Sequence, residues 1–209
     1  MHDKASPVFP STFLQMVLIL VATFAANMPS CGNNLIGLDD FTYITALPNL
    51  SGSSVAKLFL GFFEGYHPLT LLSLGATYHA FGLDPFVYHC TNLALHLANT
   101  ALVFWLVLLL FKSSPAAFAT AILFGVHPIH VEAVAWVSGR KDLQYAFFYL
   151  LSVIGYVRYA TGRSVLAYVL SMLFVILSFL SKGMAASILL TVLTVDFCLG
   201  RRVLSRAVL

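Results

Sequence analysis

Charged residues are scarce in this sequence. Only 9% of its 209 residues are Asp, Glu, Lys or Arg, whereas soluble domains carry about 25%. Apolar residues make up 60% of the chain, and the mean hydropathy is +0.91. This composition excludes an ordinary soluble domain and indicates an integral membrane protein. The net charge of +3 is too small and too scattered to favour nucleic acid as a partner.

Cysteine is also scarce. Cys31, Cys90 and Cys198 lie far apart, and no CxxC or zinc-type spacing occurs in the sequence. We interpret them as unpaired small apolar residues, although Cys31 and Cys90 could pair if both face an oxidising compartment. The sequence also lacks the HExxH motif of zinc proteases and any 34-residue helical repeat.

Long apolar runs, by contrast, are abundant. A membrane helix needs roughly 20 apolar residues to cross about 30 Å of hydrocarbon. We therefore expect an all-α bundle of about six spans, with a long first outer loop over residues 29–84. The expected spans are Val8–Met28, Pro85–Phe111, Pro115–Val126, Leu143–Tyr159, Val165–Leu180 and Met184–Leu199.

Local signals define where some of these helices start and break. Asp84 is expected to cap the second span, with Pro85 in its first turn. The third span is apolar only up to Val126, and its twelve residues make about 18 Å of helix, too little to cross. The motif HPIH is therefore expected to begin below the membrane surface, in a protein-lined or wet recess. Short helices near 54–63 and 69–81 are expected to lie on the membrane surface.

Basic residues are distributed unequally between the two sides of this topology. Seven lie on the amino-terminal side and four on the other, so the positive-inside rule predicts a cytoplasmic amino terminus. The seven are Lys4, Lys112, Arg158, Arg163, Arg201, Arg202 and Arg206, and the four are Lys57, Arg140, Lys141 and Lys182. Most acidic residues and histidines then fall near the outer face.

Two adjacent carboxylates, Asp39 and Asp40, follow the first span in the segment IGLDDFTYI. Such a pair can share a proton, bind a divalent cation, or act as a general base toward a hydroxyl. A turn or a helix cap is another ordinary use of aspartate, and spacing alone favours it.

A polar stripe runs along the second span. His89, Asn92, His96 and Asn99 recur at intervals of three, four and three residues, which places them on one helical face. Because polar groups are costly against lipid, this face is expected to line a bundle interior or a cavity. Structural hydrogen bonds between helices would explain the stripe equally well.

The segment GVHPIHVEAVAWVSGRKDLQ superficially contains a metal-binding pattern. His127 and His130 are three residues apart, and Glu132 follows. Pro128 interrupts the helix that would align the two imidazoles, so the pattern disfavours zinc.

Further along the same segment, charged residues could bind an anion. Glu132, Trp136 and Arg140 are spaced for one helical face, with Lys141 and Asp142 beside them. Arginine and lysine there could hold a phosphate, with arginine giving bidentate contacts.

Two more residues near the outer surface are candidates for substrate binding. Lys182, between the fifth and sixth spans, could bind a phosphate, or its side chain could reach toward the membrane interface. His67 stands at the head of the expected helix near 69–81, where a cap or an interface residue is the commoner role.

Four segments carry a resemblance to a known family. They are LDDFTYI, YHPLTLLSLGATYHAFGLDPFVYHCTNLALHLANTALVF, LFGVHPIHVEAVAWVSGRKDLQ and LSFLSKGMAASILLTVLTVD. Together they resemble the amino-terminal membrane region of the transmembrane and tetratricopeptide-repeat O-mannosyltransferases and their bacterial relatives, which are GT-C glycosyltransferases. The run HPIHVEAVAWVSGRKDL is highly specific. The resemblance implies a GT-C-type bundle.

The resemblance also implies a reaction. A sugar, mannose in the named family, would move from a polyprenyl or dolichyl phosphate to a Ser or Thr hydroxyl of a protein acceptor. The active face would be periplasmic or lumenal, in a bacterial inner membrane or an endoplasmic reticulum membrane. Asp39 is implied as the catalytic carboxylate, with Asp40 beside it, and Arg140 and Lys182 suit the donor phosphate. The full expected substrate-binding set is His67, His89, Asn92, His96, His127, His130, Glu132, Arg140, Lys141, Asp142 and Lys182.

Members of this family continue beyond the sixth span with further membrane helices and tetratricopeptide repeats, whereas this sequence ends at RRVLSRAVL. We therefore expect the chain to be the amino-terminal part of such a membrane domain. Two other interpretations stay open. One is a non-catalytic membrane scaffold that packs against partners. The other, less favoured, is a transporter, which would need ionisable groups near mid-membrane on several helices.

Overall fold

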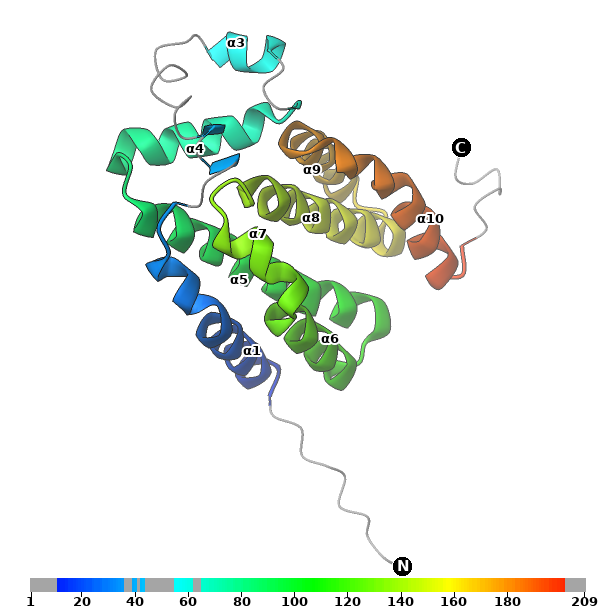
Figure 1. The fold of residues 1–209 in the computed structure, drawn as a ribbon. Coiled ribbons are helices and arrows are strands. Elements are labelled where there is room, and N and C mark those ends of the chain that lie inside the picture. Colours follow the sequence, from blue (N-terminus) through cyan, green and yellow to red (C-terminus); the bar gives the residue numbers. More distant parts are fainter. Residues whose placement is uncertain (1–10, 36–38, 41, 44–54, 62–64, 202–209) are drawn as a thin grey trace, which may run out of the picture.

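The computed structural model describes residues 11–35, 39–40, 42–43, 55–61 and 65–201, and over these residues the chain is helical with no strand (Figure 1). The all-α prediction is therefore confirmed. The elements are α1 (Thr12–Asn27), η1 (Met28–Gly32), α3 (Val55–Leu60), α4 (Pro68–Phe81), α5 (Pro85–Phe111), α6 (Ser114–Val126), η2 (Pro128–His130), α7 (Val131–Ala135), α8 (Arg140–Gly162), α9 (Val165–Ser181), η3 (Gly183–Ser187) and α10 (Ile188–Cys198).

The ends of α5 follow the predicted chemistry. The Asp84 carboxylate accepts a hydrogen bond from the backbone N–H of Phe86 at 3.0 Å, and Pro85 occupies the first turn. The helix ends where Lys112 adopts a left-handed conformation with φ of 52°. The expected helix, which starts after an Asp84 cap and ends near Phe111, is therefore confirmed.

Fewer helices are long and apolar enough to span a membrane than the six expected from the sequence. Within the described part of the chain, two segments are long and apolar enough to cross a membrane, Thr12–Gly32 and Pro85–Phe111. A third arises if α6 and the Pro128–Ala135 segment, bent by 47°, form one broken span. Helices α9 and Gly183–Cys198 are apolar but shorter. Six spans, and the placement of α3 and α4 on the membrane surface, stay predictions.

The predicted break at HPIH is present, and it frees a backbone carbonyl. The proline cannot donate a hydrogen bond, and the N–H of Ile129 binds His127 Nδ1 at 3.2 Å. The Gly125 carbonyl, which Ile129 would bind in a continuous helix, instead accepts from His96 Nε2 at 3.0 Å and Asn27 Nδ2 at 3.1 Å. Side chains from α5 and α1 therefore satisfy the backbone that the break exposes.

Helix α5 lies at the centre of the bundle and packs against α1, α6 and α8, while α8 and α9 form an antiparallel pair (Figure 1). Helix α4 packs across one end of this pair. There Thr70 Oγ1 donates to the Ser181 carbonyl at 3.1 Å, and Ser73 Oγ donates to Gln144 Oε1 at 2.9 Å. Those contacts enclose the end of the bundle at which α8 begins.

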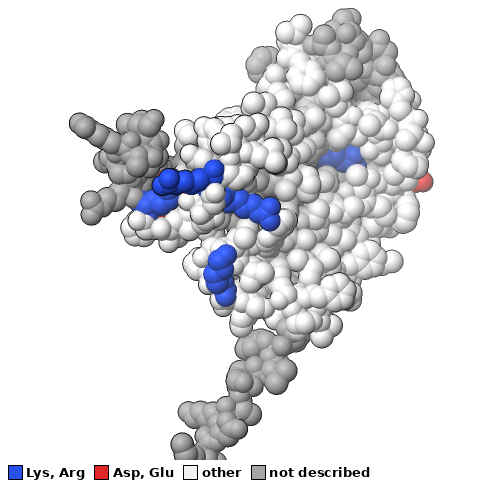
Figure 2. Space-filling view, turned by 180° about the vertical axis from the view of Figure 1, so that it is seen from behind, with Lys and Arg blue, Asp and Glu red and all other residues white. Residues whose placement is uncertain are grey.

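The opposite end of the bundle is basic. Helices α5, α8 and α10 all end there (Figure 1), and Lys112, Arg163 and Arg201 follow their last turns. Figure 2 shows Lys and Arg side chains gathered at this end. Cations at helix carboxyl ends complement the helix dipoles. Of the other residues counted for this side, Lys4, Arg202 and Arg206 lie outside the described residues.

Candidate active site

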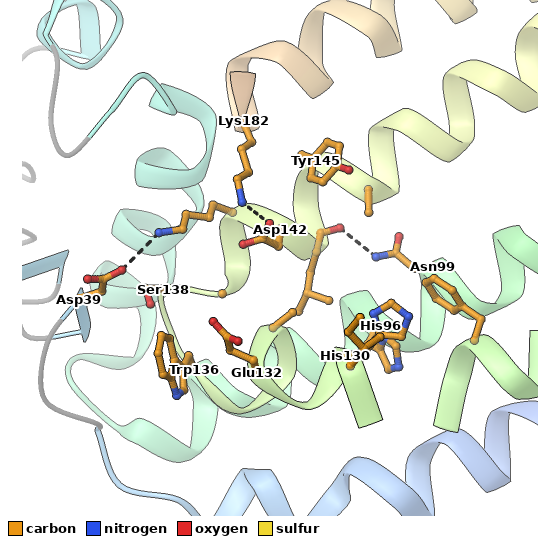
Figure 3. A pocket seen from close by; sticks show the side chains of 17 residues that line it. Asp39, His96, Asn99, His130, Glu132, Trp136, Ser138, Asp142, Tyr145 and Lys182 are labelled. Atoms are coloured by element: carbon orange, nitrogen blue, oxygen red, sulfur yellow. Dashed lines mark hydrogen bonds and ion pairs between the residues drawn. The ribbon is translucent and has the colours of Figure 1, made fainter. Parts of the chain in front are cut away.

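A cavity of about 530 Å³ lies beside the break between α6 and α7 and the first turns of α8 (Figure 3). It brings together residues from several elements that are distant in the sequence. Its polar and aromatic lining consists of Asp39, His96, Asn99, Phe124, His130, Glu132, Trp136, Ser138, Lys141, Asp142, Tyr145 and Lys182.

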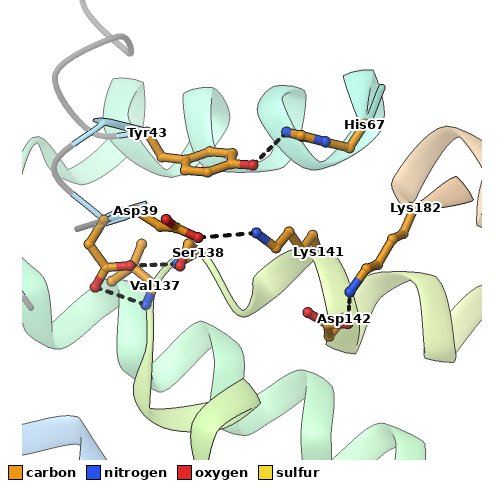
Figure 4. Close-up of polar contacts among 9 residues, drawn as sticks. Asp39, Tyr43, His67, Val137, Ser138, Lys141, Asp142 and Lys182 are labelled. Carbon is orange, nitrogen blue, oxygen red and sulfur yellow. Dashed lines mark hydrogen bonds and ion pairs between the residues drawn. The ribbon is translucent and has the colours of Figure 1, made fainter. Parts of the chain in front are cut away.

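Two ion pairs stand at the mouth of this cavity (Figure 4). Lys141 Nζ lies 3.5 Å from Asp39 Oδ2, and Lys182 pairs with Asp142. The Asp39 side chain remains 44% exposed, so a second molecule can reach its carboxylate. Asp39, Lys141 and Lys182 come from distant parts of the sequence, and the fold brings them together at this cavity.

A tyrosine and a histidine support Lys141 from the side of α4. The ammonium group of Lys141 lies 5.2 Å from the centre of the Tyr43 ring, and the Tyr43 hydroxyl is 2.7 Å from His67 Nε2 (Figure 4). Burial, with the charges of Lys141 and Lys182, lowers the pKa of His67 below its ordinary value. His67 is therefore neutral at pH 7. It contacts Tyr43 and does not line the cavity.

Asp40 has a different environment from its neighbour. It is only 2% exposed, and its carboxylate accepts hydrogen bonds from the backbone N–H groups of Ser138 at 2.9 Å and Val137 at 3.3 Å. Asp40 therefore holds the turn that leads into α8. Because Asp39 faces Lys141 while Asp40 faces backbone donors, the pair does not offer two convergent carboxylates to a divalent cation.

Arg140 is placed away from the cavity, against the expectation that it contacts a donor phosphate. Its side chain is 1% exposed. Its Nε–H donates to Asn92 Oδ1 at 3.0 Å, Nη1 donates to Thr77 Oγ1 at 2.8 Å, and Nη2 donates to the Tyr88 carbonyl at 3.1 Å. The guanidinium group therefore ties the start of α8 to α4 and α5, and the cavity cannot reach it.

The polar stripe of α5 faces the bundle interior, as predicted, and His89, Asn92, His96 and Asn99 are all buried. Much of it forms structural hydrogen bonds, because Asn92 Nδ2 donates to the Trp136 carbonyl at 2.6 Å and Asn99 Nδ2 to the Leu143 carbonyl at 2.9 Å. Only His96 and Asn99 also line the cavity. Both interpretations of the stripe therefore hold, and His96 and Asn99 form structural hydrogen bonds and line the cavity at the same time.

The two HPIH histidines have different environments, although their ring centroids lie only 6.3 Å apart. His127 is exposed and caps η2 through its Nδ1. His130 lines the cavity. Its ring centroid lies 4.4 Å from that of Phe124 and 5.5 Å from that of His96. Glu132 also faces the cavity (Figure 3). Within the described ranges, no cluster of three or more His, Cys, Asp or Glu side chains is arranged to hold a metal ion.

Sequence reasoning missed several members of the site. Tyr145 follows Lys141 by four residues, so the helical period alone would have placed both on one face. Ser138 lies in the turn that Asp40 holds, and Tyr43 supports Lys141 only through a tertiary contact. No sequence pattern reveals the last two.

Comparison with known proteins gives a consistent result. The chain is 38% identical over 96 residues to protein O-mannosyl-transferase TMTC1 of Mus musculus, covering 46% of this chain and 10% of that protein. It is 40% identical over 99 residues to tmtc2 of Xenopus laevis, covering 47% and 12%. It is 42% identical over 94 residues to Tmtc1 of Drosophila melanogaster, covering 45% and 11%. This chain is a relative of the TMTC proteins.

The resemblance seen in the sequence is therefore confirmed, over a limited region. The matched region spans 10–12% of the length of these TMTC relatives. No family model matches the sequence, and no solved structure matches it significantly. These TMTC proteins are named as protein O-mannosyl-transferases.

Proposed function

We propose that this chain forms the substrate cavity of a membrane glycosyltransferase. It would move a sugar, mannose in keeping with the names of its relatives, from a polyprenyl phosphate to a protein hydroxyl. The observation that carries the proposal is the cavity in which accessible Asp39 stands beside Lys141 and Lys182. The TMTC names support the reaction type.

Asp39 takes the role of general base. The oxygen of an acceptor Ser or Thr hydroxyl attacks C1 of the sugar while the bond from C1 to the phosphate oxygen breaks. The hydroxyl proton passes to the Asp39 carboxylate, and polyprenyl phosphate leaves with the bonding electrons. The ion pair with Lys141 orients the Asp39 carboxylate toward the cavity before the acceptor arrives. General bases of this kind contribute about 10² to 10⁴ in rate.

Lys141 and Lys182 take the role of phosphate ligands, which Arg140 cannot fill. Both ammonium groups face the cavity from the end of the bundle that α4 covers. The leaving phosphate gains negative charge as its bond to C1 breaks, and two nearby cations stabilise that charge. Trp136 and Tyr145 add aromatic walls to the same cavity.

The charge of the two ends of the bundle supports a membrane arrangement. The basic end would face the cytoplasm, and the cavity would face the periplasm or lumen. Apolar helix surfaces below the cavity would face the lipid tails, among which the polyprenyl chain of the donor also resides. Six spans and this orientation form part of the proposal.

Transfer of radiolabelled mannose from mannosyl polyprenyl phosphate to an acceptor peptide tests the proposal, with the full-length gene product in detergent or liposomes. Asp39→Asn keeps the shape of the side chain and removes its charge. We expect it to lower the transfer rate by about 10² to 10⁴ while donor binding is retained.

Asp84→Asn is the matched control, since Asp84 caps α5 outside the cavity and asparagine caps a helix equally well. We expect this variant to transfer at the parental rate. Parental transfer by Asp39→Asn would exclude Asp39 as the base. Absence of transfer in the parental protein would favour the scaffold interpretation.

A further inference from the structure

Two cysteines that are distant in the sequence meet where η1 packs against the first turns of α5. Cys31 is 7% exposed and belongs to an apolar cluster with Leu93 and Val134, against which Cys90 also packs. The two side chains therefore lie next to each other in one packed cluster. Cys198, in contrast, is exposed at the end of α10.

We propose that Cys31 and Cys90 form a disulfide bond in the mature protein, which ties the end of the first membrane helix to the start of α5. This inference rests on the proposed function in one respect, because the orientation given there places both thiols on the oxidising side of the membrane. Because both side chains belong to one packed cluster, a side-chain rotation would bring the sulfur atoms to the bond length of about 2.0 Å.

The bond forms by exchange with an oxidised thiol–disulfide oxidoreductase of the same compartment. The Cys90 thiolate, the more accessible of the two, attacks one sulfur of the oxidant's disulfide and releases the other as a thiolate. The Cys31 thiolate then attacks the Cys90 sulfur and releases the oxidant as a dithiol. The two cysteines lose two protons and two electrons, and the oxidant takes up both.

The loop that this disulfide closes contains Asp39, Asp40 and His67. Closing it reduces the conformational entropy of the unfolded chain, so the native arrangement of the loop is favoured. The bond therefore helps to keep the Asp39 carboxylate beside Lys141. Reduction should lower the midpoint of thermal unfolding in the parental protein and leave it unchanged in Cys31→Ser.

Sequential thiol labelling of the full chain in its native membrane tests the inference. Free thiols are blocked with N-ethylmaleimide under denaturing conditions, the sample is then reduced, and newly exposed thiols are counted with a polyethylene glycol maleimide. We expect two labelled thiols after reduction in the parental protein and two in Cys198→Ser. In Cys31→Ser we expect none, because the unpaired Cys90 is blocked in the first step.

Blocking of all three cysteines before reduction would overturn the proposal. Incubation of the purified, reduced protein with glutathione disulfide then distinguishes a wrong orientation from a wrong contact between the thiols. If the bond forms in this reaction but not in the membrane, the proposed orientation is wrong and the disulfide proposal falls with it. If it does not form there either, the contact between the thiols is wrong, whereas the mannosyl-transfer assay still decides the proposed function independently.

Discussion

At the scale of single residues, burial decides what each charged side chain does. Asp39 and Asp40 are adjacent, yet one stands accessible in the cavity and the other is enclosed with its oxygens on backbone N–H groups. Likewise, Arg140 is buried among hydrogen-bond partners, whereas its neighbour Lys141 faces the cavity. A buried charge requires partners for its polar atoms, so Asp40 and Arg140 hold the turn before α8 in place.

Arg140→Met should therefore weaken folding more than it weakens donor binding. It leaves Asn92, Thr77 and the Tyr88 carbonyl without their charged donor, and the expected loss of unfolding free energy is about 2–4 kcal/mol. Thermal or chemical unfolding in detergent measures the loss.

Arg158→Met is the control on the same helix, because the exposed Arg158 guanidinium only covers the Trp105 ring at 4.8 Å. Its expected loss is below about 1 kcal/mol. If the two variants are equally stable and only Arg140→Met loses donor affinity, the structural role is wrong and Arg140 binds the donor phosphate.

At the scale of elements, the break between α6 and η2 joins three helices and shapes the cavity. The Gly125 carbonyl binds side chains of α1 and α5, and the absence of a side chain at Gly125 lets these helices approach closely. A Cβ atom there would lie 2.0 Å from Thr23 Oγ1 and 3.0 Å from Thr100 Cγ2. The helices must therefore separate to accept any larger residue.

Gly125→Ala should destabilise the bundle by about 1–3 kcal/mol, as overpacking of a core does. Gly75→Ala is the matched control in α4, where a Cβ atom meets nothing within 4 Å. Alanine there should be neutral or stabilise the helix by about 0.5–1 kcal/mol. Thermal unfolding of both variants in detergent decides, and equal midpoints would show that the helices do not meet at Gly125.

At the scale of the whole molecule, one end of the bundle is basic and the other contains the cavity. Basic residues follow the carboxyl ends of α5, α8 and α10, while the cavity with its ion pairs lies at the other end. Helix α9 connects these ends and is apolar, but it is shorter than a standard span. The proposed six-span topology therefore depends on whether α9 crosses the membrane.

Single cysteines at Gly162 and Gly183, in a cysteine-free background, flank α9 at its two ends. Both positions are exposed and have open space around the Cα atom, so the substitutions should fold. We expect an impermeant thiol reagent to label Gly183→Cys from the outside and Gly162→Cys only after the membrane is opened. Labelling of both from one side would rule out the six-span arrangement.

The sequence by itself determined the features that depend on local physics. Helical class, the start of α5 at Asp84 and Pro85, the break at HPIH and the inward face of the polar stripe were all predictable. A cap, a proline without an N–H group and a helical period act within a few residues, so no distant contact was needed to read them.

Only the tertiary structure decided which member of each charged pair faces the cavity. Asp39 and Asp40 differ because the backbone of Val137 and Ser138, nearly a hundred residues away, meets one of them. Arg140 lies against α4 and α5 rather than toward the cavity because Thr77 and Asn92 present acceptors there. Adjacent side chains point in different directions, and the packing of distant helices determines which direction is buried.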